Sequence, residues 1–101
     1  MLIGKVVGTI VATQKEPTLD GSKFLVVRSV DLESLASTGG KPMGAPIVAL
    51  DAVGAGVGEI VLVASGSSAR QTEQSKERPV DAVVMAIVDQ VAVGGLETYN
   101  K

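Results

Sequence analysis

An alternating segment at the start of the chain constrains the fold more than any other feature. In residues 2–13 the even-numbered positions are all apolar or small, whereas the odd-numbered positions mix apolar residues with Lys5 and threonines. Successive side chains of a strand point to opposite faces, so this pattern predicts a long strand with one face on a core. Gly4 and Gly8 fall on the expected inward face, where they permit either sharp coiling or the close approach of another backbone, as a small barrel needs.

Four later segments are also short, apolar and bounded by turn residues. We expect strands at residues 23–32, 47–52, 59–64 and within 80–93. The segment 80–93 has the propensity of either a helix or a strand. Its many valines favour a tight turn at Val80–Ala82 followed by a buried fifth strand. Residues 94–101 predict a turn and an exposed or partner-bound tail.

One short helix completes the expected inventory. The segment 67–74 opens with serines, and Gln71 lies three residues after Ser68, which is the pattern of a capping box. The segment 33–46 is rich in glycine and proline, and we expect it to be a mobile loop. Five strands and one short helix predict a single all-β domain over 1–101, a small five-stranded barrel of the oligonucleotide-binding (OB) type.

The glycines at 54, 56 and 58 could suggest a phosphate-binding loop. A dinucleotide-binding loop has the spacing Gly-x-Gly-x-x-Gly and leads into a helix, whose free N–H groups meet the phosphates. Here the spacing is Gly54-x-Gly56-x-Gly58, an expected strand follows, and no lysine stands in a Walker pattern. We interpret the cluster as a strand-to-strand turn in which glycine permits a positive φ.

Composition excludes several classes of function. The chain has no cysteine and no histidine, so thiol and imidazole catalysis and most zinc or copper sites are excluded. The net charge is −2 and only Phe24 and Tyr99 are aromatic, which disfavours nucleic acid and anionic lipid as partners. The longest wholly apolar run, 82–88, is too short to span a membrane, and the start does not have the pattern of a signal peptide. We therefore expect a cytoplasmic protein without a cofactor or metal.

Several polar residues leave alternatives open. Carboxylates in or beside apolar strands could form a catalytic pair, or could face solvent or pair with Arg28, Arg70 or Arg78; they are Asp51, Glu59, Asp81 and Asp89. Ser67 and Ser68 beside Arg70 suit either an anion site or plain helix capping. After Pro79, Asp81 could cap the turn or meet an arginine of a neighbouring subunit.

The apolar content points to association. Counting glycine and leaving out the tyrosine raises the apolar share from 46% to roughly 57%, above the usual ~45–50%. A small domain with this excess is expected to bury some of its surface against another chain.

Three motifs in this order resemble the EutN/CcmL family of vertex proteins of bacterial microcompartment shells. They are GKVVGTIVAT, DAVGAGVGEIVLVASGSSARQ and RPVDAVVMAIVD. The resemblance implies an OB-like barrel assembled as a cyclic pentamer, which closes the five-fold corners of a shell built from hexameric tiles and is not an enzyme. It extends to both the carboxysomal and the metabolosome branches, so it does not decide between them.

The resemblance also implies places for particular residues. It puts Ser67, Ser68 and Arg70 near a narrow opening on the five-fold axis. It puts five further residues at a barrel corner and subunit contact: Asp51, Gly54, Gly56, Pro79 and Asp81. The alternative is a monomeric OB-fold module that binds single-stranded nucleic acid or a small anion, against which the shortage of aromatic and basic residues counts.

Overall fold

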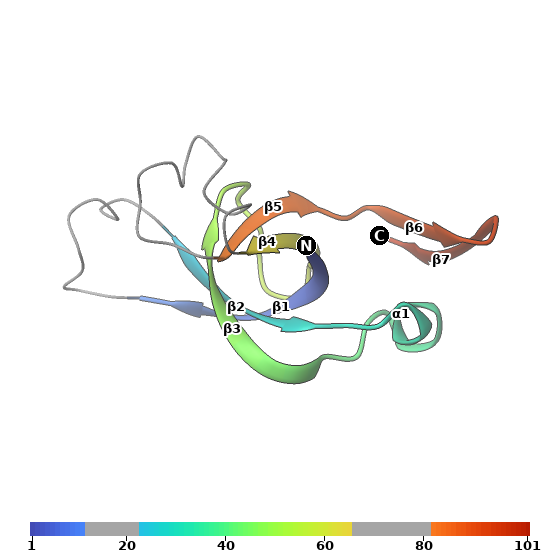
Figure 1. Cartoon of the computed structure of the whole chain (residues 1–101), viewed down its shortest axis with the longest axis horizontal. Helices are drawn as coiled ribbons and strands as arrows, with labels where there is room; N and C mark the ends of the chain where they lie inside the picture. Colours follow the sequence, from blue (N-terminus) through green and yellow to red (C-terminus); the bar gives the residue numbers. More distant parts are fainter. Residues whose placement is uncertain (12–22, 66–81) are drawn as a thin grey trace.

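The structure is a computed structural model that describes residues 1–11, 23–65 and 82–101 (Figure 1). In these residues the chain forms strands and one helix in the order β1 (Leu2–Ile10), β2 (Phe24–Ser29), α1 (Leu32–Thr38), β3 (Met43–Asp51), β4 (Ile60–Ser65), β5 (Ala82–Ile87), β6 (Gln90–Val93) and β7 (Leu96–Asn100). The expected helix over 67–74 lies outside the described residues.

Five of the strands close into a barrel with the order β1-β2-β3-β5-β4. Strand β1 pairs antiparallel with both β2 and β4, which closes the barrel, and β3 runs parallel to β5. The predicted fold class, a small five-stranded OB-like barrel with one short helix, is confirmed.

The first strand shows why glycine is needed in it. Gly4 is buried, and a Cβ added there would lie 2.6 Å from Cγ1 of Val27 and 3.0 Å from the carbonyl oxygen of Arg28. The predicted close approach is therefore correct at Gly4. It is wrong at Gly8, because a β-bulge at Val7 adds one residue and turns Gly8 to the outer face.

The barrel core consists of aliphatic side chains that point inward from all five strands. Its largest fully buried members include Val6, Leu25, Val27, Val61, Val63 and Val84. The loop between β3 and β4 adds Ala55, which is completely buried in the same cluster. A connecting segment therefore takes part in the core.

Helix α1 stands where a loop was predicted, and local capping explains it. The Asp31 side chain accepts a hydrogen bond from the N–H of Ser34 (2.6 Å), and Gly39 ends the helix with a φ of 75°. Leu35 is the buried residue of this helix. The aspartate before the helix and the glycine after it are ordinary helix boundary signals, so the sequence did carry the information.

The C-terminal part also differs from the prediction. The expected long fifth strand ends at Ile87, and the chain continues as a hairpin of β6 and β7 instead of a turn and a tail. Gly94 and Gly95 both have positive φ, 61° and 81°, which suits a two-residue hairpin turn. Figure 1 shows this hairpin and α1 at the same end of the barrel, with the hairpin projecting beyond it.

A second apolar cluster joins these parts on the outside of the barrel. Its buried members are Val30, Leu35 and Ile60, and Val91 and Tyr99 of the hairpin pack against them. The base of the hairpin is therefore attached to the outside of the barrel.

Candidate functional site

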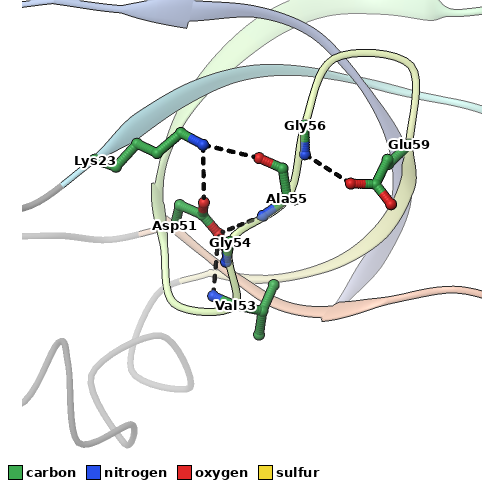
Figure 2. Close-up of polar contacts among 7 residues, drawn as sticks. All are labelled: Lys23, Asp51, Val53, Gly54, Ala55, Gly56 and Glu59. Carbon is green, nitrogen blue, oxygen red and sulfur yellow. Dashed lines mark hydrogen bonds and ion pairs between the residues drawn. The ribbon is translucent and has the colours of Figure 1, made fainter.

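The loop after β3 is organised by one buried carboxylate. The Asp51 side chain is 1% exposed. Its Oδ1 accepts hydrogen bonds from the N–H groups of Val53 (3.0 Å), Gly54 (3.0 Å) and Ala55 (3.3 Å), as Figure 2 shows. A buried carboxylate is tolerated where its oxygens are hydrogen-bonded, and here the bonds also impose the curvature of the loop.

Lys23, the residue before β2, completes this arrangement. Its Nζ lies 3.7 Å from Oδ2 of Asp51 and donates a hydrogen bond to the carbonyl oxygen of Ala55 (3.1 Å) (Figure 2). The backbone N–H of Asp51 also donates to the carbonyl oxygen of Lys23 (2.8 Å). The lysine therefore connects the carboxylate to the alanine that enters the core.

Two of the three clustered glycines have the expected backbone conformation. Gly54 and Gly58 have φ values of 79° and 93°, and a Cβ at either position would meet nothing within 4 Å. Glycine is needed there for its torsion and not for space. The expectation is wrong for Gly56, whose φ is not positive. Its N–H instead donates to Oε1 of Glu59 (2.8 Å).

Glu59 connects this loop to the end of the hairpin. Nζ of Lys101 donates to Oε2 of Glu59 (2.5 Å). The hydrogen bond from Lys101, with a smaller one from Gly56, lowers the pKa of Glu59. The same hydrogen bond raises the pKa of Lys101 above its ordinary value. The pair is partly exposed, so we expect it to orient the hairpin more than to stabilise the fold.

The arrangement offers structural chemistry and no catalytic pair. Asp51 is enclosed by its own loop, and Glu59 is held by Lys101 and Gly56. Asp51 and Glu59 form ion pairs with Lys23 and Lys101, which were not predicted. Arg70 and Arg78, two of the expected partners, lie outside the described residues. In the described part of the chain, no three histidine, cysteine or acidic residues gather as metal ligands, and no helix is long and apolar enough to cross a membrane.

The structure brings together Asp51, Gly54 and Gly56 with Glu59, whereas Asp89 is exposed. Five other residues singled out from the sequence lie outside the described residues, namely Ser67, Ser68, Arg70, Pro79 and Asp81. Sequence reasoning missed Lys23 and Lys101, whose partners are distant along the chain and leave no local signal.

A small closed barrel whose buried carboxylate binds the backbone of its own loop and one lysine is typical of a structural module. Comparison with known proteins supplies the class: residues 1–89 match the family described as "Ethanolamine utilisation protein EutN/carboxysome". The chain belongs to this EutN/CcmL family.

Relatives cover the chain from end to end. It is 48% identical over 101 residues to the carboxysome shell vertex protein CcmL of Synechococcus elongatus, covering all of this chain and 96% of that one. It is 43% identical to the microcompartment shell vertex protein EutN of Salmonella typhimurium, with the same coverage. A solved structure, the pentameric microcompartment shell protein GrpN of Rhodospirillum rubrum, is 44% identical with a TM-score of 0.77, covering 92% of this chain and 99% of that one.

Proposed function

We propose that this protein is a structural subunit of a bacterial microcompartment shell in the cytoplasm, where it forms the pentamers at the vertices. The observation that carries this function is the full-length similarity to shell vertex proteins, one of which has a pentameric structure. The protein is not an enzyme, and the enclosed Asp51 loop fits that conclusion.

Geometry explains what such a pentamer contributes. Six-fold tiles alone make a flat sheet, and units with five-fold symmetry provide the positions at which a sheet closes into a polyhedron. We infer that the partners are further copies of this chain and hexameric shell proteins, with no nucleic acid and no membrane. Both aromatic residues support the exclusion of nucleic acid, because Phe24 and Tyr99 are partly buried against apolar clusters, which reduces the surface on which a base could stack.

The residues near the five-fold axis remain part of the proposal. On the strength of the family resemblance we propose that Ser67, Ser68 and Arg70 line a central opening and that Pro79 and Asp81 lie at the subunit contact. Replacement of Ser68 by tryptophan should then alter the opening while the barrel keeps its melting temperature. A large loss of melting temperature would show that Ser68 has a core or capping role instead.

The described contacts of the loop after β3 indicate that this loop has a structural role. Asp51, Gly54 and Gly56 hold the loop that carries Ala55 into the core. We propose that this fixed loop gives a neighbouring subunit a rigid surface.

Co-expression tests the proposed function. Hexameric shell proteins produced together with this chain should form closed polyhedral particles, as seen by electron microscopy. The same hexamers produced without it should form open sheets or tubes. Equal numbers of closed particles with and without the chain would contradict a role at the vertices.

A further inference from the structure

The hairpin of β6 and β7 is joined to the chain differently from the other strands. Five strands form one closed sheet, whereas in the described part of the chain β6 and β7 pair only with each other. Among the same residues, the barrel core contains none from the hairpin. A two-stranded hairpin by itself is only marginally stable in water. The position of this hairpin beside the barrel (Figure 1) therefore depends on the contacts that attach it.

These attaching contacts are few. We call residues 89–101, which comprise the hairpin and the residues at its two ends, the arm. No residue of the arm is fully buried, and only Val91, Thr98 and Tyr99 are partly buried. Val91 and Tyr99 pack against the cluster around Ile60. Segments with few buried apolar contacts open at a lower free energy than the core does, so the arm can open while the barrel stays folded.

Backbone hydrogen bonds divide the barrel from the arm at one place. The N–H of Val88 donates to the carbonyl oxygen of Ile60 (2.8 Å), which ties Val88 to the barrel. The carbonyl oxygen of Asp89 accepts from the N–H of Lys101 (2.8 Å), which ties Asp89 to the arm. Asp89 is exposed. Hinges are commonly a few residues at the ends of elements, and the link between Val88 and Asp89 has this position.

A side-chain contact at the base holds the arm in one orientation. Nζ of Lys101 donates to Oε2 of Glu59 (2.5 Å), while Oε1 of Glu59 accepts from the N–H of Gly56 (2.8 Å), as Figure 2 shows for the latter bond. The loop therefore fixes the carboxylate, and the lysine belongs to the arm. Within the described ranges, no other side-chain hydrogen bond or ion pair connects the arm to the barrel. A single link would leave the orientation of the arm free, and this second attachment restricts it.

We propose that the arm is a hinged unit that swings away from the barrel at the link between Val88 and Asp89, and that the pair of Glu59 and Lys101 is the latch that keeps it docked. The open form exposes Val91 and Tyr99. It keeps the barrel closed, because the barrel core is built without the arm. This movement belongs to the single chain and goes beyond the proposed pentamer.

Amide hydrogen exchange of the purified full-length chain at pH 7, followed by mass spectrometry, tests the latch. Lys101→Met removes the charge and keeps a long aliphatic side chain. The amides of β6 and β7 should then exchange roughly 1.5- to 5-fold faster than in wild type, which is the range expected for a partly exposed ion pair. Peptides from the tip and from both ends of the hairpin should change by the same factor, because the arm leaves as one unit. The amides of β1 and β4 should keep their wild-type rates.

Three variants provide controls. Lys101→Arg keeps the charge and should exchange as wild type does. Lys41→Met removes an exposed lysine whose side chain has no partner among the described residues, and it should leave the arm unchanged. Glu59→Gln keeps an acceptor for Gly56 and should accelerate the same amides as Lys101→Met. Combining it with Lys101→Met should then give no further increase, because both changes remove one contact.

The possible results are distinct. Unchanged exchange of the arm in Lys101→Met would overturn the latch. An increase confined to the residues next to Lys101 would indicate fraying of the strand end, and an equal increase in arm and barrel would indicate global opening. Either of these two results would overturn the hinged arm. The proposed pentamer stands or falls by its own experiment, because none of these results depends on the number of subunits.

Discussion

Replacement of Gly4 by alanine tests the closest backbone approach in the barrel. The added Cβ would lie 2.6 Å from Cγ1 of Val27, a completely buried side chain, and 3.0 Å from the carbonyl oxygen of Arg28. Neither atom is the end of a flexible side chain, so the strands must shift. Overpacking of this kind costs about 1–3 kcal/mol, and removing a strand glycine returns about 0.5–1 kcal/mol.

Together these ranges give an expected net loss of about 0–2.5 kcal/mol in the free energy of unfolding, centred on roughly 1 kcal/mol. For a domain of this size a loss of about 1 kcal/mol lowers the melting temperature by roughly 4–8 °C. The same strand offers a matched control in Gly8→Ala, whose Cβ would lie at an ordinary 3.7 Å from Cβ of Val26.

The stability of both variants is measured by chemical denaturation and thermal melting. All samples have the same protein concentration, because the stability of an oligomer depends on concentration. Gly4→Ala should be clearly less stable than wild type, whereas Gly8→Ala should lie within about 1 kcal/mol of it. Equal stability of the two variants would refute the argument from close approach.

Three further changes have definite expected outcomes. Asp51→Ala leaves three loop N–H groups without their acceptor and should cost about 2–4 kcal/mol, whereas Asp51→Asn keeps an acceptor oxygen and should cost less than half as much in urea denaturation. The lowered pKa of Glu59 and the raised pKa of Lys101 mean that their pair contributes fully above the ordinary glutamate value of 4.5 and below the ordinary lysine value of 10.5. The stability difference between wild type and Lys101→Met should therefore be flat from about pH 5 to pH 10 and vanish in stronger acid; a difference that persists there would contradict the pairing. Gly58→Ala should cost about 1 kcal/mol or more through its positive φ, and Gly56→Ala should cost less in the same melting assay.

The sequence predicted the parts of the fold that depend on local pattern. The alternation in the first strand correctly predicted a barrel strand. The glycines after Asp51 correctly predicted a turn between two strands. The bulge at Val7 was not predicted. One extra residue moves the side chains that follow it to the opposite face of the strand, and the composition of the segment does not reveal this. The strand β7 was missed although Gly94–Gly95 is an ordinary hairpin signal, since its exposed residues suggested a tail.

The candidate site was predictable only in part. Asp51 followed by two glycines within five residues indicates a carboxylate that accepts from its own loop. Its partner Lys23 and the pair formed by Glu59 and Lys101 depend on contacts between strands that lie far apart along the chain. Such contacts follow from the closed barrel and the hairpin, and they have no counterpart in local sequence.

Electron cryo-microscopy of the purified full-length chain tests the central claim most directly. We expect class averages with five-fold rotational symmetry, in which each subunit buries different surfaces against its two neighbours. Particles that contain a single copy, or two copies related by a two-fold axis, would contradict the account.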